Sequence, residues 1–264
     1  MAGSSIPTIR SFNRYELKYL IHASQLDGII ADLSHQMAPD PHGDASGSYV
    51  ISSLYYDSSE LHMLRSKIVG TNYRRKLRVR VYGGPDAGPP RSAMVEIKQR
   101  LGRTTQKRRV VVPLGDALQL CEAQDLRAWD DDKDRAVADE IKSLVRALAL
   151  RPACTITYRR RAFMGSRFEP GLRVTFDTDI WGAPPRLDFY AQRPTAFLMP
   201  RDWSVLEIKV DDRVPNWINE LVTRHGCELR RVSKYCLGMV KLHDLKLPMA
   251  AWPMSSDRPD RHSA

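Results

Sequence analysis

Basic and acidic side chains alternate with apolar residues along several short segments of this chain. In TNYRRKLRVRVYG, residues 71–83, Lys76, Arg78 and Arg80 are each separated by one apolar residue, and AMVEIKQR places Glu96 and Lys98 in the same way. Successive side chains of a β-strand point to opposite faces, so each segment predicts a strand with one charged and one apolar face. Arginine binds two phosphate oxygens at once and lysine adds a compact charge, so such a face suits a polyanion.

Three further segments repeat this alternation, and two arrangements explain it. One is an antiparallel sheet with a solvated side. The other is a closed barrel whose charged faces point inward and whose apolar faces are covered by helices. Buried charges need counter-charges, which the interspersed acids and a bound polyanion would supply. The residue pattern leaves both arrangements open. The further segments contain Glu16 and Lys18 in RYELKYLI, Arg173 and Asp177 in LRVTFD, and Glu207 and Lys209 in VLEIKV.

The elements that must position these residues predict an α+β fold. The residue patterns predict strands at 12–21, 48–57, 72–82, 92–100, 104–113, 154–163, 172–179 and 204–210. They predict helices at 23–33, 57–67, 115–123, 133–148, 215–225 and 233–244. Both ends lack periodicity, so we expect a single domain over 10–246 between flexible tails at 1–9 and 247–264.

Composition narrows the classes of partner and compartment. The 264 residues carry a net charge of +10, which favours nucleic acid, an anionic membrane surface or phosphate chains as partners. The cysteines form no CxxC pair, which argues against a zinc site and favours a reducing, cytoplasmic setting. No secretory signal and no apolar run of about 18 residues is present, so we expect a soluble chain without a membrane span. The four cysteines are Cys121, Cys154, Cys227 and Cys236.

Eight motifs, in this order, resemble those of VTC-type polyphosphate polymerase domains, members of the CYTH-like or triphosphate tunnel metalloenzyme superfamily. The resemblance extends from about Arg10 to Asp244. It implies an eight-stranded antiparallel β-barrel tunnel with a charged lumen, flanked by helices. The motifs are RYELKYLI at 14–21, SLYYD at 53–57, KLRVR at 76–80, VEIKQR at 95–100, YRRRAF at 158–163, LRVTFD at 172–177, LEIK at 206–209 and SKYC at 233–236.

The resemblance also implies an activity and a set of site residues. Such domains transfer the γ-phosphate of ATP to a polyphosphate chain with Mn²⁺ or Mg²⁺. ATP and polyphosphate are therefore the expected partners, and Glu207 is the expected metal ligand. The expected catalytic residues are Arg78, Arg80, Lys98, Arg160, Arg173 and Glu207, and the expected phosphate-binding residues are Lys18, Arg231, Ser233 and Lys234.

The chain departs from the superfamily pattern near its start. The wider superfamily often begins with ExExK, whereas this chain has Arg14-x-Glu16-x-Lys18. The change removes one metal ligand and favours the VTC branch over the small triphosphatases. Within YRRRAF, motif register selects Arg160. One residue of the tract 107–109 offers a further phosphate ligand that the sequence does not place.

Three other functions remain open at this stage. The same tunnel could hydrolyse inorganic triphosphate or nucleotides, or it could bind polyphosphate without catalysis. Nucleic-acid binding is disfavoured, because the basic residues share strand faces with glutamates and no aromatic-rich platform appears. Eukaryotic relatives of such domains are joined to membrane segments, so any coupling to a membrane would need a separate partner protein.

Overall fold

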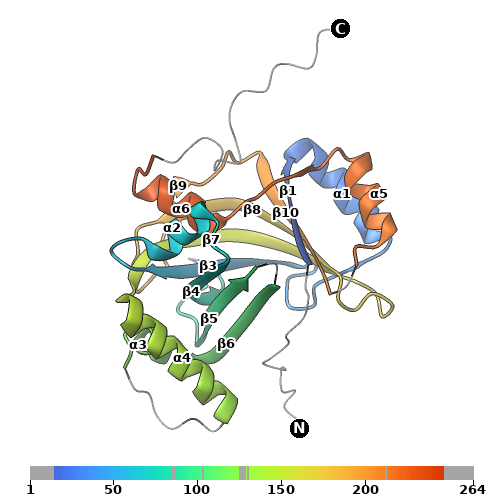
Figure 1. Cartoon of the computed structure of the whole chain (residues 1–264). Coiled ribbons are helices and arrows are strands. Elements are labelled where there is room, and N and C mark those ends of the chain that lie inside the picture. The colour runs from blue at the N-terminus through green and yellow to red at the C-terminus, as the bar shows by residue number, and fades with distance from the viewer. Residues whose placement is uncertain are drawn as a thin grey trace.

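A computed structural model describes residues 15–84, 87–102, 104–124, 129, 131–211 and 213–246, and an antiparallel sheet forms its centre (Figure 1). The eight predicted strands are confirmed, most of them within three residues at each end. They are β1 (Tyr15–His22), β3 (Ser48–Asp57), β4 (Tyr73–Tyr82), β5 (Ser92–Leu101), β6 (Thr104–Pro113), β7 (Arg151–Met164), β8 (Arg173–Ala183) and β10 (Trp203–Val210). Three two-residue strands were not predicted: β2 (Ala38–Pro39), β9 (Ala196–Phe197) and β11 (Glu228–Leu229).

The closed eight-stranded barrel is wrong for the described residues, which form an open 11-stranded sheet. The order β11-β1-β10-β8-β7-β3-β4-β5-β6 has two ends. Closure would require β6 to pair with β1, but β11 already pairs with the other edge of β1, at Tyr19 and Leu20. The sheet nevertheless curls strongly, as an ion pair between distant strands shows. Nζ of Lys98 on β5 lies 2.8 Å from Oε2 of Glu16 on β1. The two halves of the sheet therefore face each other across a concave side.

In the described part of the chain, six helices flank the sheet. They are α1 (Ala23–Ser34), α2 (His62–Val69), α3 (Leu114–Leu120), α4 (Asp132–Leu148), α5 (Asn216–Arg224) and α6 (Lys234–Leu242). α4 shows why these residues form a helix: Val137, Ile141 and Leu144 are buried at helical spacing. The Asp131 side chain caps its first turn by accepting a hydrogen bond from the Lys133 backbone N–H at 2.7 Å.

Two hydrophobic cores pack against the sheet, and the first also contains apolar residues of β7 and α6 on the concave side. In the first, apolar residues of β4 and β5, including Leu77 and Ile97, are buried in one cluster with residues of α3 and α4. In the second, Phe176 and Ile208 pack with α1 and α5. Figure 1 shows the two helix pairs at opposite ends of the sheet. Since helices cover the apolar faces, the charged faces of these strands point to the concave side rather than to open solvent.

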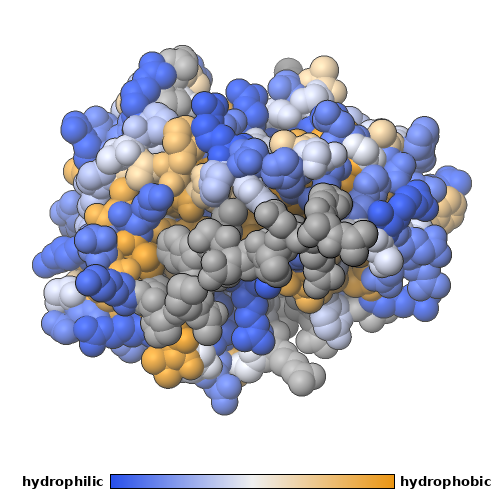
Figure 2. Space-filling view, turned by 90° about the horizontal axis from the view of Figure 1, so that it is seen from above, coloured by the Kyte–Doolittle hydropathy of each residue, from blue (hydrophilic) through white to orange (hydrophobic). Residues whose placement is uncertain are grey.

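One face of the molecule can be compared by the hydropathy of its side chains. Figure 2 shows hydrophilic side chains predominating on the face seen from above, with smaller hydrophobic groups between them. No helix in the described part of the chain combines the length and the apolar character needed to cross a membrane. The predicted tails at 1–9 and 247–264, and Arg14 with the first residues of the predicted strand at 12–21, lie outside the described residues.

Asp57 at the end of β3 connects three elements. Its carboxylate accepts hydrogen bonds from the backbone N–H groups of Met63 at 2.8 Å and Leu64 at 3.1 Å, in the first turn of α2. It also accepts one from the hydroxyl of Tyr235 on α6. Asp57 is buried, so water could not replace its carboxylate as the acceptor for these donors.

We therefore expect Asp57→Asn to lower the free energy of unfolding by about 2–3 kcal/mol, because the amide nitrogen cannot accept these hydrogen bonds. Urea denaturation followed by circular dichroism measures the change. Asp139→Asn is the matched control: its side chain is 59% exposed and pairs with Lys142 at 2.9 Å, so its loss should cost less than about 1 kcal/mol. Equal losses in both variants would contradict this role of Asp57.

Candidate functional site

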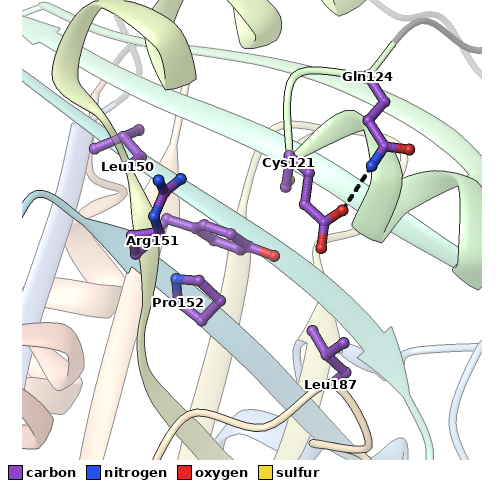
Figure 3. A pocket seen from close by; sticks show the side chains of 8 residues that line it. Cys121, Gln124, Leu150, Arg151, Pro152 and Leu187 are labelled. Atoms are coloured by element: carbon purple, nitrogen blue, oxygen red, sulfur yellow. Dashed lines mark hydrogen bonds between the residues drawn. The ribbon is translucent and has the colours of Figure 1, made fainter.

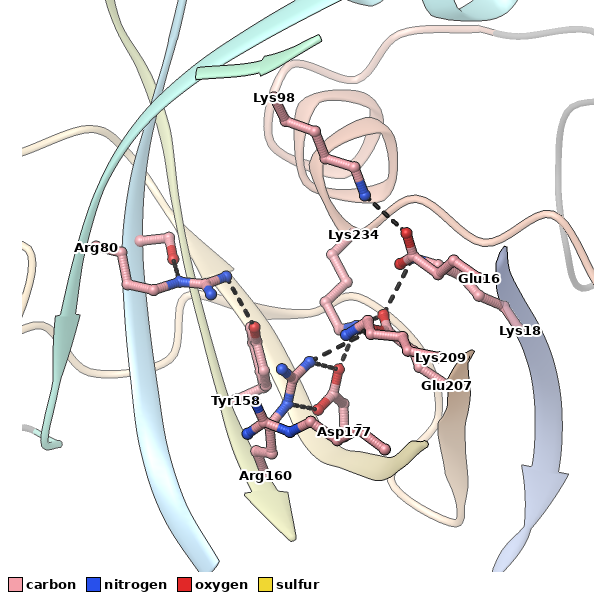
Figure 4. A network of polar contacts seen from close by, with 12 residues as sticks. Glu16, Lys18, Arg80, Lys98, Tyr158, Arg160, Asp177, Glu207, Lys209 and Lys234 are labelled. Atoms are coloured by element: carbon pink, nitrogen blue, oxygen red, sulfur yellow. Dashed lines mark hydrogen bonds and ion pairs between the residues drawn. The ribbon is translucent and has the colours of Figure 1, made fainter. Parts of the chain in front are cut away.

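Charged side chains from seven strands and α6 meet on the concave side of the sheet. We call this set the charged interior; Figure 4 shows several of its members pointing toward one another. The side chains alternate with the buried apolar residues of the same strands, as the sequence pattern predicted. The charged interior consists of Glu16, Lys18, Lys76, Arg78, Arg80, Glu96, Lys98, Lys107, Arg160, Asp177, Glu207, Lys209 and Lys234.

Glu207 on β10 lies at the centre of one group of cations (Figure 4). Its Oε1 atom is 3.0 Å from Nζ of Lys18 on β1 and 3.0 Å from Nζ of Lys234 on α6. Its Oε2 atom is 2.9 Å from Nζ of Lys209 and 3.5 Å from Nη2 of Arg160 on β7. Although burial opposes ionisation, Lys18, Lys209, Lys234 and Arg160 hold the pKa of Glu207 well below its ordinary value. One carboxylate thus faces four cations from four elements.

Arg160 is the one residue of the arginine triplet 159–161 that lies in the charged interior. Its Nε and Nη2 atoms donate to the two oxygens of Asp177 on β8, at 2.6 and 2.7 Å. Strand alternation turns its neighbours away: Arg159 is exposed, and Arg161 donates to the backbone carbonyl of Ser46 at 3.1 Å. The structure therefore places Arg160 where motif register predicted, and it adds Asp177 as the partner.

The start of α6 projects into the charged interior. Ser233 caps this helix, and its hydroxyl oxygen accepts hydrogen bonds from the Cys236 backbone N–H at 3.4 Å and from Nζ of Lys76 on β4 at 3.0 Å. The next residue, Lys234, is buried and contacts both Glu207 and Asp177. Of the predicted pair, Ser233 thus caps the helix, and Lys234 forms ion pairs with residues of the sheet.

Glu96 on β5 organises a second group. Its Oε2 atom is 2.6 Å from Nη2 of Arg78 and 3.8 Å from Nη1 of Arg80, both on β4, and its Oε1 atom is 2.8 Å from Nζ of Lys107 on β6. Burial opposes ionisation, but these three cations hold the pKa of Glu96 well below its ordinary value. Arg78 also donates to the hydroxyl of Tyr55 at 2.9 Å. Two predicted residues, Arg78 and Arg80, therefore share one buried carboxylate.

A bridge of ion pairs connects the two halves of the sheet. Glu16 on β1 accepts from Nζ of Lys98 on β5 at 2.8 Å and lies 3.2 Å from Nζ of Lys18. Although burial lowers the pKa of Lys18, Glu207 and Glu16 raise it above its ordinary value. Lys18 and Lys98, which the resemblance assigned to phosphate, are thus joined to each other through Glu16.

Positive charge is in excess in the charged interior, which has nine basic side chains and four carboxylates. Lys76 has no carboxylate partner within ion-pair distance among the described residues, and burial lowers its pKa to about 8. Buried donors also lack partners: Nε of Arg173 and the hydroxyl of Thr175, on the same face of β8, make no hydrogen bond in the described structure. An anion would supply acceptors for these groups and neutralise the excess charge.

Two predicted site residues form no ion pair with either group among the described residues. Arg173 on β8 lies opposite Lys209 of β10, but its guanidinium donates to Asp40 at 2.6 Å and to the hydroxyl of Tyr49 at 2.7 Å. Arg231 is exposed and precedes the cap of α6 by two residues. The structure therefore does not bring Arg173 and Arg231 into contact with the other predicted residues.

Several members of the charged interior were not predicted as site residues. Glu96, Asp177 and Lys209 follow from the alternation itself, since each shares a strand face with a predicted residue. In the tract 107–109, Lys107 reaches Glu96, whereas Arg108 points outward and binds Glu140 on α4 at 2.5 Å. Only the positions of β5 and α4 distinguish these two.

Glu207 could contribute to a divalent metal site only together with phosphate ligands. The described residues contain no group of three or more histidine, cysteine or acidic side chains that could hold a metal ion. Both oxygens of Glu207 already lie within ion-pair distance of basic groups. Mg²⁺ and Mn²⁺ are commonly held by one or two carboxylates plus phosphate oxygens and water. The described residues therefore form no metal site by themselves, and a metal on Glu207 would need phosphate oxygens and water as its other ligands.

A pocket of about 410 Å³ lies elsewhere, beside the start of β7 (Figure 3). Its lining includes Tyr56, Cys121 and Arg151, none of which belongs to the charged interior. Burial raises the pKa of Cys121 to about 12, so its thiol stays protonated near neutral pH and is a poor nucleophile. Glu122 accepts a hydrogen bond from Gln124 at 2.8 Å. The side-chain chemistry favours the charged interior as the functional site.

The carboxylate of Glu96 should contribute to stability in a pH-dependent way. Because its pKa is lowered on folding, its contribution is present above the unfolded pKa of about 4.3 and is lost as the pH falls through the folded value. We expect Glu96→Gln to lower the free energy of unfolding by about 3 kcal/mol near pH 7. The difference from wild type should shrink below about pH 4. Urea denaturation at both pH values measures it, and a constant difference would contradict the assigned ion pairs.

Comparison with known proteins identifies the family. The VTC domain model matches residues 13–243. Subunit 4 of the vacuolar transporter chaperone complex is 23% identical over 280 residues in Trypanosoma cruzi strain CL Brener and 23% over 289 residues in Trypanosoma brucei brucei. These alignments cover 88% and 91% of this chain but 34% and 36% of the relatives. The chain thus spans about a third of their length.

Two of the solved structures that match this chain resemble it distantly. A candidate adenylate cyclase from Bacillus halodurans has a TM-score of 0.47 and 11% identity, covering 84% of this chain and 95% of its own. A candidate adenylyl cyclase from Hippeastrum, described as having a dominant triphosphatase activity, has a TM-score of 0.46 and 16% identity, with 88% and 97% covered. These scores are too low to support an inference about function. The family match, in contrast, spans nearly all of the described residues, and the chain belongs to the VTC domain family.

Proposed function

We propose that this domain is a polyphosphate polymerase-type phosphotransferase that moves the γ-phosphate of ATP to the end of a polyphosphate chain. One observation supports the proposal most directly: basic side chains from several strands and α6 converge on one concave side and outnumber the carboxylates there. A narrow, multiply charged chain matches this arrangement, because its phosphates would contact cations on more than one wall at once.

Each group of the charged interior has a role in this proposal. Arg78 and Arg80 bind phosphate oxygens from the β4 side, and Arg160 and Lys234 bind them from the opposite side. When phosphate binds, Lys18 and Lys98 give up part of their contact with Glu16 and contact the phosphate instead. The carboxylates Glu16, Glu96, Asp177 and Glu207 keep the cations in place before the substrate binds. Such preorganised charge stabilises the transition state without rearrangement during the reaction.

The proposed transfer breaks the bond between the γ-phosphorus and the oxygen that bridges it to the β-phosphate. A bond forms from the γ-phosphorus to an oxygen of the terminal phosphate of the chain, and ADP leaves. Phosphoryl transfer depends mainly on alignment and charge stabilisation, so no side-chain nucleophile is required. A bound Mn²⁺ or Mg²⁺, held by Glu207 and phosphate oxygens, would neutralise charge on the reacting phosphates.

The relatives suggest a protein partner as well. The two similar trypanosomal proteins are named as subunits of a complex, and this chain spans about a third of their length. We propose that this domain also works with a partner protein.

The central test is incubation of the purified chain with ATP and Mn²⁺, with ADP, free phosphate and polyphosphate resolved on a gel. Wild type should give ADP and a polyphosphate ladder. Arg160→Ala should reduce turnover by about 100-fold, because it removes a buried cation from the phosphate path. Arg159→Ala is the matched control, since this neighbour is exposed on the other face of β7. Arg78→Ala with Arg80→Ala, and Glu207→Gln, should also lose the ladder.

Other outcomes of this assay would contradict the polymerase. Free phosphate without a ladder would indicate a triphosphatase that uses the same site with water as the acceptor. Polyphosphate binding without turnover would indicate a binding module. Equal activity of the Arg159 and Arg160 variants would show that the charged interior takes no part in the reaction.

Lys76 should make phosphate binding depend on pH. Its buried amino group has a pKa lowered to about 8, and it faces Tyr55, Lys67, Lys98, Tyr235 and Cys236. Bound phosphate favours the protonated form, so affinity should fall as the pH rises through about 8 and the free protein loses this proton. Calorimetric titration with tripolyphosphate from about pH 7 to about pH 9 measures the effect.

Lys76→Met should make this pH dependence shallower, and because the ligand titrates identically in both proteins, the difference isolates Lys76. An unchanged pH profile would mean that Lys76 does not contact phosphate.

A further inference from the structure

The charged face of the sheet continues beyond the charged interior at one end of β4 and β5. Arg74 and Arg100 are direct cross-strand partners, one step beyond the pair Lys76 and Lys98 on the same strand faces. At the usual rise per residue, Arg74 lies about 13 Å along β4 from Arg78. The face therefore continues from the buried residues near Glu96 toward solvent, where Arg100 is exposed.

Two further basic residues lie at this end. Lys67 is in the last turn of α2, whose residues contact β4 and α6. Arg231 is exposed two residues before Ser233, which binds Lys76. Burial, followed by Arg100 and Arg231, lowers the pKa of Arg74. Burial together with Arg74, Arg100 and Arg231 lowers the pKa of Lys67 as well. Arg74 and Arg100 are cross-strand partners, Lys67 is on the helix that contacts β4 and α6, and Arg231 lies just before α6. The four cations, called here the outer basic cluster, therefore gather at this end of the sheet.

The outer basic cluster differs from the charged interior in its lack of acids. Arg74 donates to the backbone carbonyl of Thr71 at 2.7 Å, and Arg100 donates to that of Gly102 at 2.9 Å. Within the described ranges, no carboxylate forms an ion pair with any of the four cations. Each row of the interior has a carboxylate nearby, whereas this outermost row has none. Like charges held together without acids are destabilising until an anion neutralises them.

We propose that the outer basic cluster of Lys67, Arg74, Arg100 and Arg231 binds the distal phosphates of a polyphosphate chain whose end lies in the charged interior. The inference rests on the proposed function and adds a determinant of chain length to it. A triphosphate would occupy the interior alone. A longer chain would continue along the β4 and β5 face and gain the contacts of the outer row.

The test compares two ligands on three proteins by competition binding. The ligands are tripolyphosphate and a polyphosphate long enough to extend past the interior. Arg74→Gln with Arg100→Gln should weaken binding of the long chain about tenfold and reduce its salt dependence, while tripolyphosphate affinity stays unchanged. Lys133→Gln with Arg146→Gln is the charge-matched control, because both residues are exposed on α4. This control should bind both ligands like wild type.

The outcomes separate this inference from the proposed function. Equal weakening of both ligands, or of the long chain in the control variant too, would overturn the outer site, as would no weakening. Failure of wild type to bind either ligand would instead reject the proposed function. A single-stranded oligonucleotide of matched charge that competes as well as polyphosphate, and loses the same affinity in the variant, would reassign the cluster to nucleic acid. Unchanged tripolyphosphate binding reports that the variant is folded.

Discussion

Excess positive charge on a concave, partly buried face is the constraint on which the rest of this structure depends. Cations that leave bulk water lose solvation, and like charges repel one another. The chain offsets these costs with four carboxylates, each shared among several cations, of which Glu207 is the extreme case with four. The compensation is incomplete, as the lowered pKa of Lys76 shows. This uncompensated charge is the observation behind the proposed binding of a polyanion, which would neutralise it.

The architecture places this charge by separating the two faces of each strand. Helices α3 and α4 cover the apolar face of one half of the sheet, and α1 and α5 cover the other. The curl of the sheet then brings the polar faces of distant strands together, so that Lys98 of β5 meets Glu16 of β1. α6 adds Lys234 from the concave side, and Asp57 fixes α6 to α2 and β3 through Tyr235. The site is thus shared by the whole fold.

Along β4 and β5, the partners of the basic side chains change from carboxylates at the inner end to neutral groups at the outer end. Near Glu96 each cation has a carboxylate, at Lys76 the partner is a hydroxyl, and at Arg74 and Arg100 only backbone carbonyls accept. The exposure of the basic side chains rises in the same direction, so solvent rather than carboxylates stabilises the outer charges. In the proposed function, the inner part of this face would hold a few phosphates tightly, and the outer part would attract a chain at longer range.

The sequence by itself determined the strands, the helices and the face to which most charged side chains belong, because alternation with period two is a local property of the backbone. It also indicated Arg160 over its neighbours through motif register. Only the tertiary structure decided which strands meet. Pairing of β1 with β11 leaves the sheet open, although a closed barrel was expected.

The tertiary structure also decided the ion-pair partners. It paired Arg173 with Asp40 and Tyr49, although this residue lies opposite Lys209 across the sheet. At Asp179 a positive φ of 46° and an irregular register with β7 end the alternation, and this residue pairs with Arg201. Partners far apart in sequence depend on curvature, bulges and helix placement, which no local pattern encodes.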